Sequence, residues 1–234
     1  FSQEINLKNG SVYNIVFLGE DLAGNEASGM TIENIEFDDG PPILTIDINS
    51  EYNSFNSPSF NYSISEDLSY GKIIFENTSG VNDSNSPHII SLSNNELLSG
   101  KHIDETFSTE PILVHNGIYK ITFYGADNAG NEASEVSIVE MKFDNILPVS
   151  DISYPLPFSI INDHEVNYTL SENLKDGYAI WTQISGNDDL SSPRKIKMKV
   201  NEMQAGEIST IFAQPEPLIN GAIYNLSLQL IDEA

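Results

Sequence analysis

The sequence predicts an all-β protein built from sandwich-like units that repeat along the chain. Segments of 5–8 residues rich in Ile, Val, Tyr, Phe and Thr alternate with clusters of Gly, Asn, Asp, Ser and Pro, a spacing typical of β-sandwiches. The segments recur, since Tyr13, Tyr119 and Tyr224 lie 106 and 105 residues apart in matching surroundings. No segment shows an apolar stripe with a period of 3.6 residues, so we expect helices to be absent or limited to single turns.

This period predicts three copies of one unit. Residues 1–40 form the C-terminal part of a preceding copy, and residues 41–145 form one complete copy. Residues 146–234 form a following copy that lacks its last strand or strands. We therefore expect the chain to be a slice of a longer tandem array, with Phe1 lying inside that protein.

Seven strands are predicted for the complete copy, and each is a short run of β-forming residues that ends at a turn. They cover residues 43–48, 59–65, 71–76, 88–93, 102–107, 118–125 and 136–143. In the second strand Phe60, Tyr62 and Ile64 alternate with polar residues and are expected to face the core. In the sixth strand Tyr119, Ile121 and Phe123 share one face.

These features resemble the immunoglobulin-like fold, in particular the tandem bacterial Ig-like domains of large extracellular or cell-surface repeat proteins. Tyr13, Tyr119 and Tyr224 occupy the place of the tyrosine corner near the start of the sixth strand. Phe75 and Trp181 occupy the third-strand position of the core Trp. The tail D-x-A-G-N, followed by F-D-x-x-x-P, is similar to the signature of those bacterial modules. The cysteine pair of antibody domains is absent.

Composition excludes several classes of protein. The chain has no Cys, so it contains no disulfide, thiol nucleophile or zinc finger. No apolar run approaches the roughly 18 residues that cross a bilayer, so this segment is not expected to insert into a membrane. Thirty-five acidic residues against ten basic ones give a net charge of −25, which disfavours nucleic acid and anionic membrane surfaces as partners. A solvated acidic surface or a divalent-cation binder remains.

An enzyme is not expected. The sequence has no G-x-S-x-G, P-loop, G-x-G-x-x-G or H-E-x-x-H motif. Its four histidines do not recur from copy to copy: His88 is replaced by Arg194 in the following copy, and His102 by Ile208. We interpret the histidines as isolated surface or loop residues.

Acidic residues do recur where three segments are expected to meet at one end of a sandwich. These segments are the entry to the first strand, the loop after the second strand and the turn after the sixth strand. They supply candidate Ca²⁺ ligands at the two joints between copies: Asp38, Asp39, Glu66, Asp67 and Asp127 at the first, and Asp144, Glu172 and Asp232 at the second. Clustered carboxylates repel one another unless a cation bridges them, and oxygen ligands suit Ca²⁺.

A second interpretation of these residues stays open. The stretches Asp21–Asn25 and Asp127–Asn131 are also good turn chemistry, because Asp accepts backbone N–H bonds and Gly or Asn adopts positive φ. Asp38 could similarly hold its linker by hydrogen bonds.

The resemblance implies a non-enzymatic structural or adhesive segment of an extracellular surface protein. It would act as a stalk, spacer, or building block of a fibre or layer. Its partners would be neighbouring repeats of the same chain, other copies of itself, or a cell-surface or glycan partner. The alternative is a carbohydrate- or receptor-binding Ig-like module with Tyr70 and Tyr124 as an aromatic platform.

Overall fold

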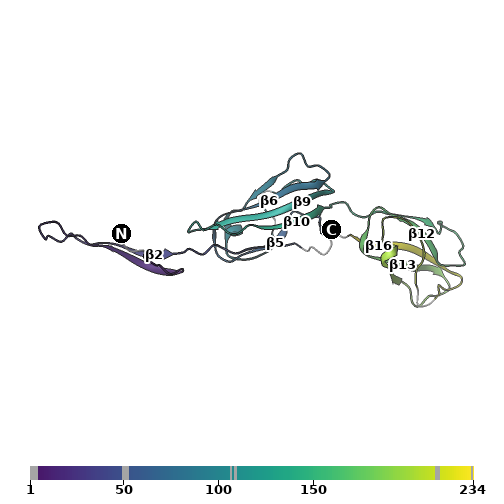
Figure 1. The fold of residues 1–234 in the computed structure, drawn as a ribbon. Coiled ribbons are helices and arrows are strands. Elements are labelled where there is room, and N and C mark those ends of the chain that lie inside the picture. Colours follow the sequence, from purple (N-terminus) through teal and green to yellow (C-terminus); the bar gives the residue numbers. More distant parts are fainter. Residues whose placement is uncertain (1–4, 49–52, 106, 108–109, 214–216, 233) are drawn as a thin grey trace. The chain divides into compact units, whose positions relative to one another are not determined.

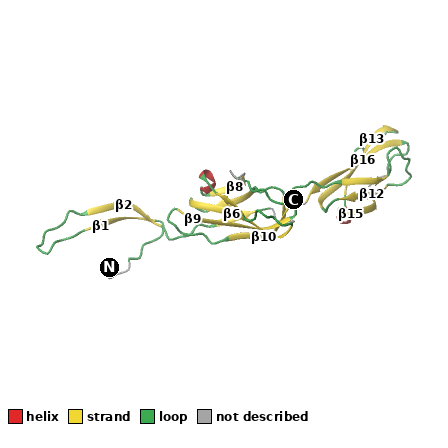
Figure 2. Ribbon diagram, turned by 90° about the horizontal axis from the view of Figure 1, so that it is seen from above, coloured by secondary structure: helices red, strands yellow, loops and turns green. Residues whose placement is uncertain are grey.

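The computed structural model describes residues 5–48, 53–105, 107, 110–213, 217–232 and 234. The chain divides into two compact units, one of Phe1–Ile48 and Pro58–Met141 and the other of Asn49–Ser57 and Lys142–Ala234. Strands dominate both units (Figure 2). In the described residues the helices are the short 3₁₀ segments η1 (Asn94–Leu97) and η2 (Val200–Glu202), so the expectation of single turns at most is confirmed there.

The preceding copy contributes an antiparallel hairpin of β1 (Ser11–Phe17) and β2 (Met30–Phe37). A β-bulge lies between Tyr13 and Ile15, where the Asn14 Oδ1 atom accepts a hydrogen bond of 3.0 Å from the Asn34 backbone N–H. Asn34 has a φ of 61°, and its counterpart Glu140 in the complete copy has a φ of 58°. A residue in the left-handed backbone conformation therefore recurs at this point from one copy to the next.

The complete copy forms two sheets (Figure 1). One has the order β3-β5-β8, from β3 (Leu44–Asp47), β5 (Phe60–Ile64) and β8 (Gly100–Glu105). The other has the order β4-β10-β9-β6-β7, from β4 (Ser54–Phe55), β6 (Leu68–Gly80), β7 (His88–Ser91), β9 (Gly117–Asp127) and β10 (Val136–Phe143).

The core of the complete copy lies between these sheets. Tyr62 of β5 meets Phe123 of β9 edge to face, with ring centroids 5.5 Å apart, the geometry that aromatic pairs favour. Phe75, Tyr119 and Ile121 are fully buried beside them. Each such side chain contributes on the order of 1.5–3 kcal/mol by leaving water. The predicted inward faces are confirmed for Tyr62 and Ile64, whereas the Phe60 side chain lies outside the described ones.

The following copy repeats the arrangement. One sheet has the order β11-β12-β15, from β11 (Ser150–Tyr154), β12 (Glu165–Leu170) and β15 (Gly206–Ile211). The other has the order β14-β13-β16, from β13 (Leu174–Gly186), β14 (Arg194–Lys197) and β16 (Ala222–Asp232). Trp181 packs in the core at the place of Phe75, with its ring edge-on to Tyr224 at 6.3 Å.

The long pair of strands in each copy keeps the same register. Phe75 lies opposite Ile121 in the complete copy, and Trp181 lies opposite Leu226 in the following one. Both pairs carry two bulges at matching positions, between Leu68 and Tyr70 and between Asn77 and Ser79 in the complete copy. The boundaries of the copies stay a prediction. The pairing register of β6 with β9, however, matches that of β13 with β16 along the full length of both pairs.

Three details were not predicted from the sequence. β6 extends from Leu68 to Gly80 rather than over 71–76, because the bulges let polar residues at both ends continue the pairing with β9. β4 has two residues, too short to show a period, and pairs in parallel with Lys142 and Phe143. The predicted end of the fifth strand, residues 106 and 107, lies beyond β8, and residue 106 is outside the described residues.

Candidate metal centres and the tyrosine network

Three carboxylates that lie far apart in the sequence meet in the first unit. Each of Asp38, Glu66 and Asp127 offers an oxygen, and these oxygens all lie within 4.8 Å of one another. Asp38 directly follows β2, Glu66 lies in the turn between β5 and β6, and Asp127 is the last residue of β9. The pairing of β6 with β9 brings the second and third of these together, because Leu68 lies opposite Asp127.

Asp127 also closes its own turn. Its Oδ1 atom accepts the Asn131 backbone N–H at 2.9 Å and its Oδ2 atom accepts the Asn131 side-chain amide at 2.8 Å. Loss of hydration works against ionisation of this buried carboxyl, but the hydrogen bonds from Asn131 outweigh it and the pKa of Asp127 is lowered. Asp21 makes the same contacts with Asn25 in the hairpin. Turn chemistry is therefore visible in both copies.

Glu66 is the member of the cluster that turn chemistry does not explain. Loss of hydration, and then repulsion from Asp38 and Asp127, raise the pKa of its carboxyl. The fold thus holds Glu66 where its negative charge is unfavourable. A cation among the three carboxylates would remove that repulsion, and oxygen ligands of this kind suit a hard ion such as Ca²⁺.

The second unit contains the equivalent cluster. Oxygens of Asp144, Glu172 and Asp232 also lie within 4.8 Å of one another. Asp144 follows β10, Glu172 lies between β12 and β13, and Asp232 ends β16. These three side chains line one polar pocket together with Lys142. The Lys142 ammonium lies 2.6 Å from the Asp144 Oδ2 atom, so this cluster already has one cation of its own.

Six of the eight predicted ligands are thus gathered into two sets of three, and two are not. The Asp67 Oδ1 atom instead accepts the Ser99 backbone N–H at 2.7 Å, and bonds from Ser99 lower the pKa of Asp67. The Asp39 backbone N–H donates to Asn9 at 3.2 Å. In the part of the chain that the structure describes, no other set of three His, Asp or Glu residues converges in this way.

A second repeated constellation combines the tyrosine corners, which were predicted from the sequence, with two buried aspartates, which were not. Each copy carries a tyrosine corner, in which the hydroxyl accepts the backbone N–H five residues upstream: Tyr13 from Lys8 at 2.8 Å, Tyr119 from Val114 at 2.9 Å and Tyr224 from Ile219 at 3.0 Å. The hydroxyls of Tyr119 and Tyr224 also donate to a buried aspartate, Asp83 at 2.9 Å and Asp189 at 2.8 Å. These aspartates are 106 residues apart, and this match to the repeat period is the signal from which they could have been predicted.

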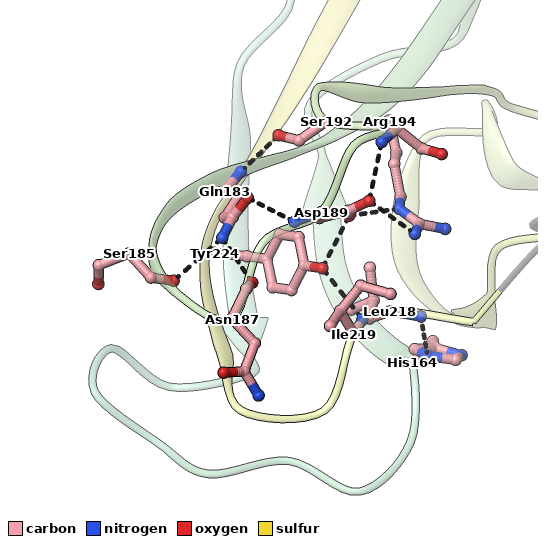
Figure 3. A network of polar contacts seen from close by, with 11 residues as sticks. His164, Gln183, Ser185, Asn187, Asp189, Ser192, Arg194, Leu218, Ile219 and Tyr224 are labelled. Atoms are coloured by element: carbon pink, nitrogen blue, oxygen red, sulfur yellow. Dashed lines mark hydrogen bonds and ion pairs between the residues drawn. The ribbon is translucent and has the colours of Figure 1, made fainter.

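A basic side chain completes each network. Arg194 donates from Nε to Asp189 Oδ2 at 2.6 Å and from Nη2 to Asp189 Oδ1 at 2.9 Å (Figure 3). His88 occupies the matching place, with Nε2 2.6 Å from Asp83 Oδ2. The interpretation of His88 as an isolated surface residue was therefore wrong, because the ring is largely buried against a carboxylate. His102 also has partners, stacking on Tyr62 at 4.3 Å with Nε2 2.9 Å from the Leu98 carbonyl.

The sheets, the paired registers and the tyrosine corners define a chain of tandem immunoglobulin-like β-sandwiches. No protein-family model matches the sequence, and no curated protein matches it. Among solved structures, the chicken CNTN1 FN1–FN3 domains match over 97% of this chain and 72% of theirs, at 10% identity and a TM-score of 0.36. So distant a likeness carries no argument about function. No helix in the described residues is long and apolar enough to cross a membrane.

Proposed function

We propose that this chain is a non-enzymatic structural or adhesive segment of an extracellular surface protein, acting as a stalk, spacer, or building block of a fibre or layer. Ca²⁺ bound at the two acidic clusters would stiffen the passage from one repeat to the next. The observation that carries this proposal is the recurrence of the three-carboxylate cluster. One ligand of each, Asp38 or Asp144, belongs to the segment that leads into the next copy.

The physical reason is coupling between a linker and a sandwich. Without a cation, Asp38 and Glu66 repel each other, which favours separation of the linker from the loop. With Ca²⁺ bound, the linker, the loop after β5 and the end of β9 share one ion. Binding that requires this geometry stabilises the folded state by about 2.7 kcal/mol when free Ca²⁺ reaches about 100 times its Kd.

Thermal melting of the full chain tests this proposal. We expect the melting temperature to rise by several degrees on addition of Ca²⁺ and to return on chelation, at constant ionic strength maintained with NaCl. Replacement of Glu66 by Gln together with Glu172 by Gln should abolish the rise. The matched control is Asp67→Asn, since Asp67 lies outside the clusters. A melting temperature indifferent to Ca²⁺ in the unmodified chain would contradict cation binding.

The surroundings of Tyr70 and Tyr124 give little support to the alternative of a carbohydrate-binding platform. Tyr70 is 45% exposed, but the Lys72 ammonium lies over the Tyr124 ring at 5.0 Å and the Tyr124 hydroxyl donates to Glu135 at 3.2 Å. A ring occupied in this way does not offer its face to a sugar. Saturable binding of the chain on a glycan array would nevertheless favour this alternative over the spacer.

A further inference from the structure

The basic residues of this chain are concentrated on one strand. Four of the ten lie within six residues in and directly after β14: Arg194, Lys195, Lys197 and Lys199. No acidic residue interrupts them, although the whole chain has 35 acidic residues. Arg194 is buried and paired with Asp189. The three lysines are therefore the exposed part of this basic group.

The fold accounts for the alternate residues of this strand but not for its lysines. The inward residues are apolar in both copies: Ile196 and Met198 in the following copy, Ile90 and Leu92 in the complete one. Where the following copy has its three lysines, the complete copy has Ile89, Ser91 and Ser93. Lysines often protect the edge of a sheet from unwanted pairing. However, β7 lies at the same edge of its sheet without any lysine, so edge protection does not explain them.

The local contacts of the lysines leave their charge at the surface. The Lys195 ammonium lies 4.0 Å from the centroid of the Tyr178 ring, a contact that does not neutralise it. The Lys197 ammonium lies 3.3 Å from the Asp176 Oδ1 atom, but 66% of the Lys197 side chain is exposed. Because β14 is the first strand in the sheet order β14-β13-β16, it presents a positively charged strip at the edge of that sheet.

The chain also contains a surface of opposite charge. Residues 9–71 have eleven acidic residues and no basic one. In strand β2 of this stretch, Glu33 and Glu36 are exposed. Their counterparts in the complete sandwich are Val139 and Lys142, whose side chains are also largely outside the core, with exposed fractions of 57% and 42%. These two positions therefore stay accessible when a sandwich is complete.

The two pairs of charges have matching spacing. Lys195 and Lys197 are two residues apart on one strand, which separates them by roughly 7 Å. Glu33 and Glu36 are three residues apart, but the β-bulge of the hairpin lies between them, where β2 has one residue more than β1. Since a bulge takes up one additional residue, the glutamates are also roughly 7 Å apart along the strand.

We propose that β14 of one copy of this protein binds β2 of a second copy, with Lys195 and Lys197 placed against Glu33 and Glu36. Charge complementarity carries this inference. The net charge of −25 opposes association, but at 0.15 M salt charges act over only about 8 Å. At that range the lysine strip is attracted to a surface that lacks basic residues.

This contact joins two different surfaces, so a copy that is bound through β14 still offers β2 to another copy. Such association is open-ended and builds a fibre or layer unless it closes into a ring. The inference thus names the contact surface for the fibre or layer of the proposed function and rests on that part of it. It does not rest on cation binding at the acidic clusters.

Sedimentation equilibrium of the full chain in 0.15 M NaCl with a chelator tests the proposal. We expect the average mass to rise above 25.8 kDa at protein concentrations on the order of 0.1–1 mM, because exposed ion pairs give weak contacts. Replacement of both Lys195 and Lys197 by Glu should weaken self-association roughly tenfold, because two attractions become repulsions.

The complete copy offers a closely matched control. Lys72 lies over the Tyr124 ring and Lys120 pairs with Glu135, as Lys195 and Lys197 do with an aromatic ring and an acid. Replacement of both Lys72 and Lys120 by Glu gives the same net charge and removes the same kinds of local contact. We expect it to weaken self-association by less than about twofold, because charges outside the contact are screened.

A charge exchange completes the test. A chain with Lys195→Glu, Lys197→Glu, Glu33→Lys and Glu36→Lys has the original net charge and should recover self-association. If these variants do not fold, Lys195→Gln with Lys197→Gln should still weaken it at least about twofold.

An unmodified chain that stays monomeric at 1 mM would overturn the proposal, and so would a folded exchange variant that does not associate. Binding of the chain to heparin through these lysines, without self-association, would assign β14 to an anionic polysaccharide and would also overturn it. Each of these results leaves the effect of Ca²⁺ on the melting temperature unchanged, so the two proposals fail separately.

Discussion

At the scale of single residues, Lys142 marks the main difference between the two acidic clusters. Its ammonium lies against Asp144, whose side chain is 3% exposed, whereas the Lys142 side chain is 42% exposed. The residue at the same place before the first cluster is the exposed Glu36. A built-in cation at one cluster and an additional acid near the other predict unequal affinity for Ca²⁺.

We predict that replacement of Lys142 by Gln strengthens Ca²⁺ binding at the second cluster. Removal of the ammonium takes away the positive charge of Lys142 beside Asp144, so the cluster becomes more negative and attracts a metal ion more strongly. Because Lys142 is partly exposed, we expect a modest effect, roughly three- to tenfold in Kd. Calorimetric titration in a Glu66→Gln background isolates this cluster. Lys197→Gln is the matched control, since Lys197 pairs with Asp176 at 3.3 Å outside the clusters. An unchanged or weaker affinity in Lys142→Gln would count against the assignment.

At the scale of elements, the corner at the start of β9 joins a strand, a loop and a buried network. The Tyr119 hydroxyl accepts from Val114 and donates to Asp83. Removal of this hydroxyl takes the acceptor from the half-buried Val114 N–H, at a cost of about 0.5–1.5 kcal/mol, and takes one of several donors from buried Asp83, at a cost of about 1.5–3 kcal/mol. We predict that Tyr119→Phe lowers the free energy of unfolding by about 2–4 kcal/mol, measured by urea denaturation.

Tyr13 provides the control for this change. Its hydroxyl makes the same corner contact with Lys8, but the bond is exposed to solvent. We expect Tyr13→Phe to change stability by less than about 1 kcal/mol, because water replaces the lost partner. Equal losses in the two variants would show that the contact with Asp83 contributes nothing.

The elements also show how far the sequence could lead. Alternation and turn residues predicted the strands, because a half-buried strand needs every second side chain apolar, as in β9. The repeats also pointed to the eight proposed ligands, since each lies at a recurring loop or strand end. Six of these ligands do converge in the two clusters. The sequence pattern could not separate Asp67 from Glu66, because which of two neighbouring carboxylates turns toward Asp127 depends on the backbone of one loop. It missed Asp83, because a buried aspartate within a polar loop looks like any other surface acid.

At the scale of the whole molecule, the net charge of −25 acts on every repeat. Mutual repulsion of acidic surfaces keeps such a chain soluble and opposes compact association of its parts. The carboxylates gathered at the clusters are where a divalent cation would most reduce that repulsion. In the proposed spacer, cation binding at the linkers would therefore convert a jointed array into a stiffer one.

Small-angle X-ray scattering of the full chain with and without Ca²⁺ tests this claim most directly. We predict that Ca²⁺ at constant ionic strength narrows the distribution of interatomic distances, that chelation restores the broad distribution, and that the combined Glu66→Gln and Glu172→Gln variant stays broad throughout. A distribution that is the same in Ca²⁺ and in chelator, or one that narrows equally in the variant, would contradict the proposed role of the two clusters.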